Sequence, residues 1–518
     1  MTLSSPSDDL PVVANGHDLT LWDVVCVAAR RVPVCIPAEA EAAMRASRRS
    51  VEEMLEEDRV VYGITTGFGF MKDRRISPDE VGRLQTNLVR SHAAGVGPPL
   101  PTSVVRAMML LRLNALVKGF SGIRTEVVAL LAEMLNRGVH PQIPSQGSVG
   151  ASGDLSPLSH LALVLMGEGV AEYRGMLLPG REALEAAELA PIQLAAKEGL
   201  ALINGTQAMT AMGCLMIDQA HQLAKLADLV AACSVEALLG SHTPFHAAVH
   251  ALRPHPGQLA SARNLVKLLD GSQLVETHRH CNQVQDGYSL RCVPQIHGAS
   301  RDTIRHARSV FQIEINAVTD NPLIFSAAGE AVSAGHFHGQ PVALPLDFLG
   351  IAVAELANVS ERRTERLVNP TLSNGLPAFL TGKPGLNSGY MVAQYTAAAL
   401  VSENKVLCHP ASVDSIPTSA GQEDHVSMGT IAARKLMRIV EHTRQVLAIE
   451  LLCACQALDL RGEIPPGHGV AAAHRYVRQF VPHLDDDRIL ASDIATLTPH
   501  LEEGRLLSAV EAAVGPLE

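Results

Sequence analysis

Aromatic residues are scarce in this chain. Phe, Trp and Tyr together make up 3% of the 518 residues, although 47% of the residues are hydrophobic. A core without aromatic rings has to be built from Ala, Leu, Val and Ile, and this composition favours helix packed on helix. The chain is long enough for two or three ordinary domains or for one large one.

The chain also lacks an excess of positive charge. Its net charge of -11 and its pI near 6.1 argue against nucleic acid or an anionic membrane surface as the main partner. The N-terminal stretch "MTLSSPSDDLPVV" has neither the basic start nor the apolar run of a signal peptide. No uninterrupted apolar run approaches the roughly 18 residues of a membrane span. We therefore expect a cytoplasmic protein.

Metal-binding patterns are absent from the sequence. The nine cysteines show no ligand spacing. Cys453 and Cys455 form a C-x-C pair inside an apolar segment, so we expect them to be small buried hydrophobes in a reducing compartment. The histidines contain no H-E-x-x-H pattern and only two isolated H-x-H pairs, at His278 with His280 and at His336 with His338. We predict no metal site.

Helical periodicity dominates the rest of the chain. Residues 20 to about 140 read as short helices, and long helical segments such as 431–460 follow from about residue 200. Strand signals are few, around "GMLLPG" and "PLIF", and no period of 20 to 50 residues repeats. The sequence predicts a mostly α protein: a smaller head domain at 1–205 that carries the active-site loops, and a long helical bundle at 206–518.

The most informative short stretch is "GSVGASGDLSPLSH", which contains Ala151-Ser152-Gly153. Ser156 and Pro157 resemble an N-cap and a first helical residue, so the turn precedes a helix N-terminus. One interpretation is a tight turn and nothing more. A serine nucleophile is a second, but the pattern departs from G-x-S-x-G at its last position and no strand precedes it.

A third interpretation is that the three residues react with one another. The nitrogen of Gly153 attacks the carbonyl of Ala151, and the loss of two waters, one of them from Ser152, leaves an exocyclic methylidene on a five-membered imidazolone ring. Such a ring is a strong electrophile that no encoded side chain supplies. Crowding explains the small residues on either side, and the elimination explains the serine.

The chain resembles the aromatic amino-acid ammonia-lyases, whose prosthetic group, 4-methylidene-imidazol-5-one, forms autocatalytically from Ala-Ser-Gly. The resemblance runs from about residue 60 to 460. It is carried in order by "YGITTGFG" (62–69), "NLVRSHAAGVG" (87–97), "GSVGASGDLSPLSHLAL" (147–163), "KEGLALINGTQAM" (197–209), "VQDGYSLRCVPQIHGA" (284–299), "DNPLIF" (320–325), "FHGQPVAL" (337–344) and "SVDSIPTSAGQEDHVSMG" (412–429).

This resemblance implies an ammonia-lyase/fumarase-like fold and a homotetramer in which more than one chain contributes to each active site. It also implies carbon–nitrogen lyase activity without a metal or a dissociable cofactor. The motifs "RSHAAGVG" and "QEDHVSMG" favour the members that act on histidine. The expected reaction converts L-histidine to trans-urocanate and ammonia.

The resemblance also assigns roles to individual residues. The ring from Ala151, Ser152 and Gly153 captures the substrate amine, and Tyr62 is the base at the β-carbon. A phenol has a pKa near 10, so we expect helix N-termini to lower the pKa of Tyr62. The substrate-binding residues implied by the resemblance are Arg291 for the carboxylate, His92 and Glu423 for the imidazole, and Asn204, Gln285, Tyr288 and Phe337 around the ring.

Several alternatives remain open on sequence alone. Taken singly, each of these residues has an ordinary role in packing, in ion pairs or on a solvated surface. The substrate is open among histidine, tyrosine, phenylalanine and a thiol-modified histidine, and a 2,3-aminomutase uses the same electrophile. Long apolar helices also fit a non-catalytic scaffold. Two positions depart from the family pattern, namely His336 for an asparagine and Gly287 for an alanine or a proline.

Overall fold

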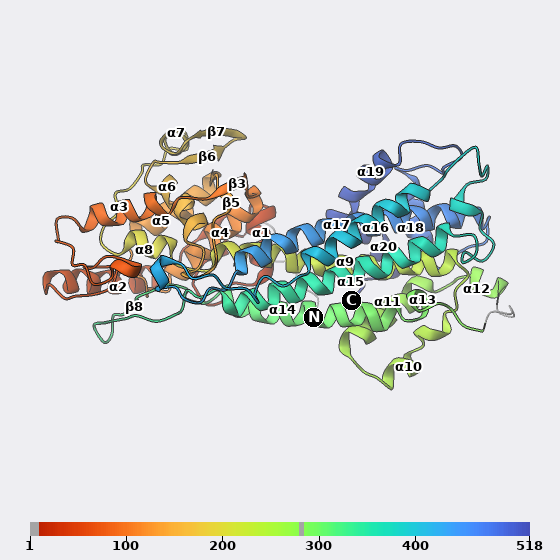
Figure 1. Cartoon of the computed structure of the whole chain (residues 1–518), viewed down its shortest axis with the longest axis horizontal. Helices are drawn as coiled ribbons and strands as arrows, with labels where there is room; N and C mark the ends of the chain where they lie inside the picture. Colours follow the sequence, from red (N-terminus) through yellow and green to blue (C-terminus); the bar gives the residue numbers. More distant parts are fainter. Residues whose placement is uncertain (1–9, 279–283) are drawn as a thin grey trace. The chain divides into compact units, whose positions relative to one another are not determined.

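Helices make up most of the regular structure in the computed structural model, which describes residues 10–278 and 284–518 (Figure 1). The prediction of a mostly α protein is therefore confirmed. His280 and the first nine residues lie outside the described residues. The structure therefore does not describe part of the N-terminal stretch or the second histidine of the first H-x-H pair. The chain forms two compact units, and each of them is assembled from three segments.

Unit 1 contains residues up to 218, 307–347 and 410–434. Its helices are α1 (Leu21–Ala29), α2 (Ala38–Glu56), α3 (Val81–His92), α4 (Thr102–Leu116), α5 (Thr125–Arg137), α6 (Leu155–Leu165), α7 (Gly180–Ala186), α8 (Glu198–Ile203) and the 3-10 turns η1 (Gly69–Met71) and η4 (Ser419–Gly421). Its strands are β1 (Val12–Val13), β2 (Val34–Cys35), β3 (Val96–Pro99), β4 (Val139–Pro141), β5 (Pro144–Gln146), β6 (Val170–Tyr173), β7 (Met176–Pro179), β8 (Leu323–Phe325) and β9 (Glu330–Val332).

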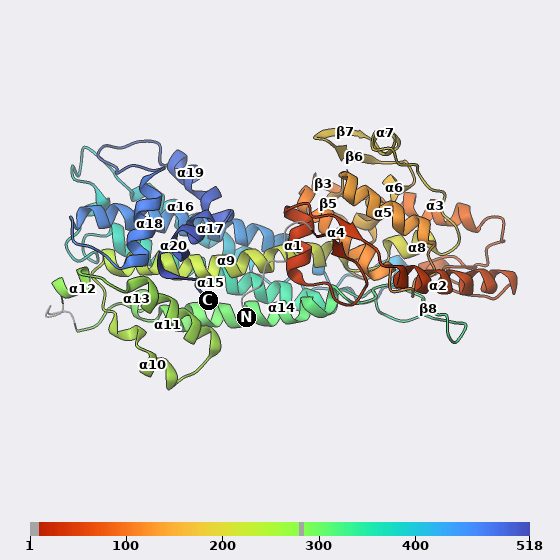
Figure 2. The same cartoon turned by 180° about the vertical axis from the view of Figure 1, so that it is seen from behind.

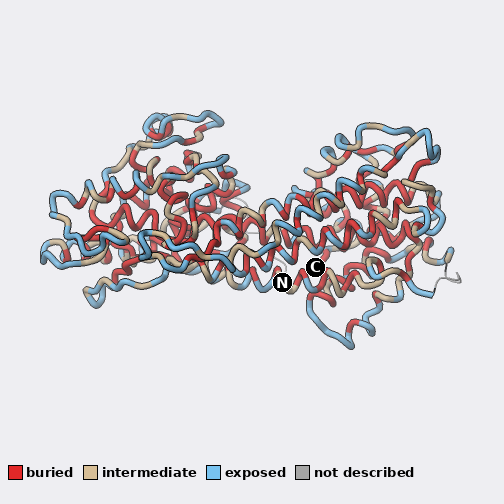
Figure 3. Tube along the Cα trace, viewed as in Figure 1, coloured by how far each residue is buried: buried red, intermediate tan, exposed pale blue. Residues whose placement is uncertain are grey.

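The strands of unit 1 form small sheets. The largest has three antiparallel strands in the order β4-β6-β7, and the others are the pairs β1-β2, β3-β5 and β8-β9. Strands β6 and β7 lie beside α7 (Figure 1), and most of β7 is exposed, as Figure 3 shows. Strands β7 and β8 coincide with the two strand signals "GMLLPG" and "PLIF".

Helix α4 is the centre of the core of unit 1. Every residue from Val104 to Leu116 is buried, including Arg106 and Arg112, whose side chains have to find polar partners inside the core. Helices α1 and α5 pack against it. A helix with no solvated face can form only where neighbouring elements cover it on all sides.

Two helix boundaries differ from the sequence expectation. Helix α6 begins at Leu155, with Asp154 as the capping residue, so Ser156 is inside the helix and is not its N-cap. The backbone nitrogen of Asp154 donates to Gly205 O, which fixes the chain just before the helix. The pattern "DEVGRLQTNLVRSHAAGVG" predicts a helix that ends at Gly95 and Gly97, whereas helix α3 ends earlier, at His92.

Four long helices each belong partly to unit 1 and partly to unit 2, and they are α9 (Gln207–Ala237), α14 (Val293–Glu314), α15 (Gln340–Val368) and α17 (Gly429–Leu460). The remaining elements of unit 2 are α10 (Ala247–Ala251), α11 (Pro256–Leu269), α12 (Leu274–Thr277), α13 (Tyr288–Arg291), α16 (Met391–Leu407), α18 (His468–Arg478), α19 (Leu490–Glu502), α20 (Arg505–Val514) and the 3-10 turns η2 (Thr243–Phe245) and η3 (Ala378–Leu380). Figure 2 shows these helices from behind. The predicted helix at 431–460 matches α17 closely.

Small side chains and buried ion pairs characterise the core of unit 2. Fully buried alanines on α9 and α17 allow helices to approach closely. Cys453 and Cys455 are buried and free, as predicted, and burial raises the pKa of both thiols. The predicted domain boundary at residue 205 stays a prediction. It describes two domains that are each continuous in sequence, whereas each compact unit combines three segments.

Helix α15 is long and apolar enough to cross a membrane by length and composition alone. In the structure, 67% of its most apolar window is buried against other parts of the protein. Arg363 near its C-terminal end forms a fully buried ion pair with Glu450 of α17, at 2.5 Å and 2.9 Å. Burial in a protein core therefore accounts for the composition of this helix.

Removing one charge of this pair leaves the other charge buried in the core without a counter-charge. We expect Glu450→Gln to lower the free energy of unfolding by about 3–5 kcal/mol, because Arg363 then stays buried without a counter-charge. Chemical denaturation followed by circular dichroism measures this loss. Glu41→Gln is the control, since its pair with Arg45 is exposed and such pairs contribute about 0–1 kcal/mol. Equal losses in the two variants would contradict this account of the core.

Candidate active site

The Ala151-Ser152-Gly153 segment is packed against the turn before α9. Gly153 has a φ of +74° and pairs with Gly205 in a parallel bridge. The next backbone nitrogen, that of Asp154, donates to Gly205 O at 2.6 Å. A Cβ on Gly153 would lie 2.0 Å from the same oxygen, so only glycine fits here. Ala151 is also buried, with 4% of its surface exposed.

A buried carboxylate also anchors this segment. Asp154 is fully buried and accepts hydrogen bonds from Ser148 Oγ, Thr430 Oγ1 and the backbone nitrogen of Met209. Burial raises the pKa of this carboxyl, and the hydrogen bonds partly oppose the rise. Asp154 lies in the motif "GSVGASGDLSPLSH", but the sequence pattern alone indicates no role for it. Only the tertiary structure shows that it joins the tripeptide to α9 and α17.

The hydroxyl of Ser152 donates to Glu423 Oε1 at 2.7 Å. Glu423 Oε2 accepts from the hydroxyl of Thr418, and the backbones of the same two residues pair across a tight turn. Ser419 and Ala420 in that turn both have positive φ angles, of 51° and 52°. Non-glycine residues in this region cost about 1–2 kcal/mol each. Such strain is typical of functional sites. Here the strained turn holds the Glu423 carboxylate beside Ser152.

Tyr62 lies in the glycine-rich loop that follows α2. Its hydroxyl accepts a hydrogen bond from the backbone nitrogen of Gly69 at 3.2 Å, and its ring packs edge-on against Phe68. Burial raises the pKa of Tyr62, the negative charge of Glu423 adds to the rise, and the Gly69 N–H only partly opposes it. The expectation of a lowered pKa is therefore wrong for this chain, because desolvation of the phenolate outweighs the single backbone donor.

His92 is the last residue of α3 and is half-buried. Its Nδ1 is 2.9 Å from Leu88 O, and since a carbonyl can only accept, Nδ1 carries the proton. Burial lowers the pKa of this imidazole, although the charge of Glu423 works in the opposite direction. His92 is therefore neutral near pH 7, and its Nε2 is an acceptor.

Asn204 and Phe337 belong to the same unit as the tripeptide. Asn204 is buried, and its Nδ2 donates to Asn321 O at 3.1 Å. Phe337 is half-buried in a segment that the Gly339 nitrogen ties to Gly150 O at 3.2 Å. Unit 1 thus brings together most of the residues implied by the resemblance, although their roles stay predictions.

Gln285, Tyr288 and Arg291 belong to unit 2. Gln285 and Tyr288 are exposed, Tyr288 to 70% of its surface. The guanidinium of Arg291 lies 4.7 Å from the centre of the Tyr288 ring, and its Nε donates to Asp286 O. Within residues 10–278 and 284–518, no carboxylate forms an ion pair with Arg291. An ordinary surface ion pair therefore does not explain this residue.

The two departures from the family pattern have different surroundings. His336 is exposed in a turn. Gly287 has a φ of -62°, which any residue adopts, so conformation does not require a glycine. A Cβ at this position would lie 2.7 Å from Nη1 of Arg366, and the glycine thus makes room for that guanidinium.

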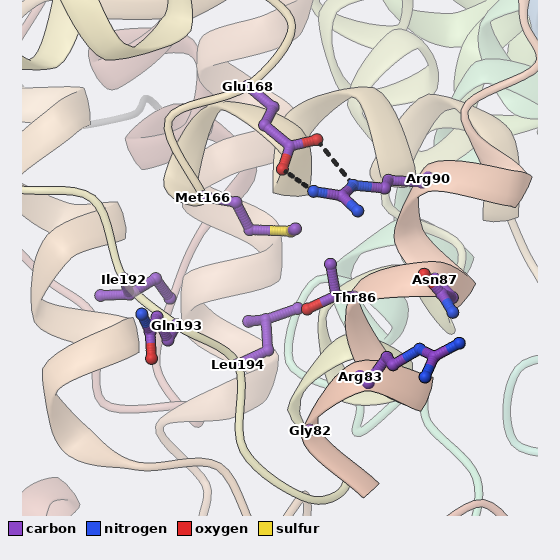
Figure 4. A pocket seen from close by; sticks show the side chains of 10 residues that line it. All are labelled: Gly82, Arg83, Thr86, Asn87, Arg90, Met166, Glu168, Ile192, Gln193 and Leu194. Atoms are coloured by element: carbon purple, nitrogen blue, oxygen red, sulfur yellow. Dashed lines mark hydrogen bonds and ion pairs between the residues drawn. The ribbon is translucent and has the colours of Figure 1, made fainter. Parts of the chain in front are cut away.

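A cavity of about 570 Å³ lies elsewhere in unit 1 (Figure 4). One face of α3 lines it with Arg83, Thr86 and Asn87, and the Arg90–Glu168 ion pair borders it. Its lining contains none of the residues implied by the resemblance. In the described part of the chain, no group of three or more His, Cys, Asp or Glu side chains is arranged to hold a metal ion.

Comparison with known proteins shows the family of this chain. The sequence profile described as "Aromatic amino acid lyase" matches residues 19–479. The chain belongs to the aromatic amino acid lyase family, a class of carbon–nitrogen lyases. A protein named histidine ammonia-lyase from Gloeobacter violaceus is 59% identical over 98% of this chain and 99% of its own length.

Two solved structures extend the similarity to three dimensions. The tyrosine aminomutase of Streptomyces globisporus has a TM-score of 0.93 at 40% identity, and covers 98% of this chain and 100% of its own. The histidine ammonia-lyase of Trypanosoma cruzi has a TM-score of 0.90 at 44% identity, and covers 98% of this chain and 96% of its own. Family membership excludes the interpretation as a non-catalytic helical scaffold.

The contact between Gly153 and Gly205 gives a direct test of the site geometry. We expect Gly153→Ala to lower the free energy of unfolding by at least about 3 kcal/mol, because the Cβ is strained and overlaps a backbone oxygen. Gly175→Ala is the matched control, with a φ of +79° and nothing within 4 Å, and we expect a loss of about 1–2 kcal/mol. Denaturation curves of the two variants measure the difference, and the absence of a difference would disprove the close approach.

Proposed function

We propose that this chain deaminates L-histidine to trans-urocanate and ammonia. The observation that carries the proposal is the arrangement of Glu423 beside Ser152, with His92 in the same unit, in a chain 59% identical to a histidine ammonia-lyase. An imidazole substrate needs polar partners, whereas a phenyl ring needs apolar walls. Neutral His92 offers an acceptor nitrogen, and Glu423 offers a carboxylate.

We further propose that Ala151-Ser152-Gly153 matures into 4-methylidene-imidazol-5-one. The residues fit this group, because Ala151 is buried, Gly153 has no room for a side chain and the Ser152 hydroxyl is held by an acceptor. When present, the group supplies an electrophile for the amine of the substrate. Asp154 then anchors the backbone of the segment, whereas the Glu423 carboxylate faces the segment.

Tyr62 is the proposed base, which takes the β-proton on its phenolate oxygen. The Gly69 N–H contacts this oxygen and stabilises its charged form. Arg291 is proposed to hold the substrate carboxylate bidentately, with Gln285 and Tyr288 beside it. The exposed ring of Tyr288, which only the Arg291 guanidinium is shown to contact, and the absence of an ion pair at Arg291 in the described chain suit residues that complete a site.

We propose that the enzyme is a cytoplasmic homotetramer whose active sites combine residues of more than one chain. Free cysteines throughout the described residues agree with a reducing compartment. An assembly of this kind lets residues as distant in sequence as Tyr62, Arg291 and Glu423 act on one substrate. Size-exclusion chromatography with light scattering determines the assembly directly.

A 2,3-aminomutase is the second candidate, and the TM-score of 0.93 to a tyrosine aminomutase favours it. The two reactions differ in product, because a mutase returns the amine to the β-carbon. An assay of histidine, tyrosine and phenylalanine that follows ammonia, unsaturated acid and β-amino acid together separates them. We expect ammonia and urocanate from histidine in equal amounts. Faster turnover of tyrosine or phenylalanine, or accumulation of a β-amino acid, would contradict the proposal.

Replacement of the acceptor nitrogen tests recognition of the imidazole. We expect His92→Phe to lower kcat/KM for histidine by about 10- to 100-fold, which corresponds to one lost hydrogen bond in a desolvated site. Activity towards phenylalanine should not fall in parallel, since the new ring is apolar. Steady-state kinetics with both substrates measure the change in preference, and a uniform loss on both would show that His92 does not select the substrate.

The pH dependence tests Tyr62. Burial raises its pKa above the ordinary 10.0, so the phenolate is a minor species at pH 7 and its fraction grows with pH. We therefore expect kcat/KM to rise by up to about tenfold per pH unit between pH 7 and 9. Tyr62→Phe should show only residual activity without this slope. A wild-type profile that is flat over this range would be incompatible with Tyr62 as a base of raised pKa.

A further inference from the structure

Arg112 of α4 is a fully buried cation, and no sequence motif marks it. Its Nη1 donates to three oxygens from two other segments: Asn204 O at 2.9 Å, Gln207 Oε1 at 3.0 Å and Thr319 O at 3.2 Å. The first two lie where α8 ends and α9 begins. One nitrogen thus joins α4 to the start of α9 and to the loop before β8.

The segment that Arg112 holds is the one against which the tripeptide packs. Gly205 lies between Asn204 and Gln207, and its oxygen accepts from Asp154 N, the nitrogen that follows Gly153. The space around Gly205 is filled, since a Cβ there would lie 2.5 Å from Arg112 Nη1 and 2.6 Å from Thr319 O. A displacement of Arg112 therefore moves the surface on which Gly153 rests.

Burial of this guanidinium is unfavourable for stability by itself. Its Nε and Nη2 are buried without a hydrogen-bond partner among the described residues. The nearby carboxylate of Asp320 already pairs with the buried Lys197 at 2.8 Å. An apolar side chain of similar size would avoid these penalties. The planar guanidinium instead provides donors in a fixed geometry, which hold acceptors from separate segments together.

We propose that Arg112 is a positioning residue for the maturation of the prosthetic group, an inference that rests on the proposed function. It holds Asn204-Gly205 in place, and Gly205 in turn holds the peptide that follows Gly153 while the ring closes. In this reaction a bond forms between Gly153 N and the carbonyl carbon of Ala151. The carbonyl oxygen leaves as water with the hydrogens of Gly153 N and Ser152 N, and Ser152 loses its hydroxyl and its α-hydrogen as a second water, without an oxidant.

The physical reason is that an intramolecular attack on an amide depends on the orientation of the reacting atoms. A displacement of about 1 Å costs on the order of 10²-fold in rate. Gly153 approaches Gly205 too closely for any side chain, so even a small shift of Gly205 reaches the nitrogen that attacks. Arg112 touches neither reacting atom and acts through Gly205.

The experiment compares Arg112→Lys with Arg106→Lys in the full-length protein. Arg106 is the matched control, because it is buried on the same helix and also donates to two backbone oxygens, those of Val27 and Leu135. Neither oxygen belongs to the segments that Arg112 holds around Gly205. The readout is the intact mass of freshly purified protein, followed over days of incubation. Circular dichroism confirms that each variant is folded.

We expect the wild type and Arg106→Lys to be lighter than the encoded chain by two waters. Arg112→Lys should be folded and should lose these waters about 10- to 100-fold more slowly. Should Arg112→Lys be insoluble, Gln207→Ala removes one of the three acceptors while keeping the charge, and we expect slower maturation in it too.

The outcomes separate the inference from the function on which it rests. A wild type of full encoded mass would overturn the proposed prosthetic group and, with it, the inference. A wild type that loses two waters, together with an Arg112→Lys variant that loses them equally fast, would overturn only the positioning role. Equal slowing in Arg106→Lys would also overturn it, since the effect would then be one of general core stability.

Discussion

The close approach of Gly153 to Gly205 is the constraint on which the rest of the site depends. It forces a left-handed backbone at residue 153, excludes any side chain there and requires a rigid surface at the start of α9. The strongly held groups around it follow from this requirement. Asp154 fixes the segment to α9 and α17, and Arg112 holds the residues on either side of Gly205-Thr206, namely Asn204 and Gln207. Buried polar groups are unfavourable unless they are satisfied, and here they specify one backbone geometry.

The two carboxylates beside the tripeptide, those of Asp154 and Glu423, differ in burial and in hydrogen-bond partners. Asp154 is fully buried, and hydroxyls and a backbone N–H of the protein surround it, so it has a structural task. Glu423 lies in a strained turn and is half-buried, with one oxygen directed at Ser152. Strain in a turn is typical of functional sites, and the positive φ angles of Ser419 and Ala420 agree with the proposed role of this turn.

The helical class and the long helix α17 could be predicted from the sequence, because periodicity is a local signal. The chemistry of Ala151-Ser152-Gly153, which a rare motif suggests, stays a prediction. The environment of Tyr62 could not be predicted, since its pKa depends on burial by residues distant in the chain. The N-cap of α6 was misplaced by two residues because a tertiary hydrogen bond from Asp154 to Gly205 decides where the helix begins. Arg112 gave no signal at all, as a cation inside an apolar helix reads as a surface residue.

The central claim is that the chain modifies its own backbone at residues 151–153. Tandem mass spectrometry of the proteolytic peptide that contains this segment tests it most directly. The account predicts a peptide short of two waters, with the deficit located between Ala151 and Gly153 and with no fragmentation at the bonds inside the ring. A peptide of full encoded mass from catalytically active protein, with an ordinary fragment ending at Ser152, would contradict the account.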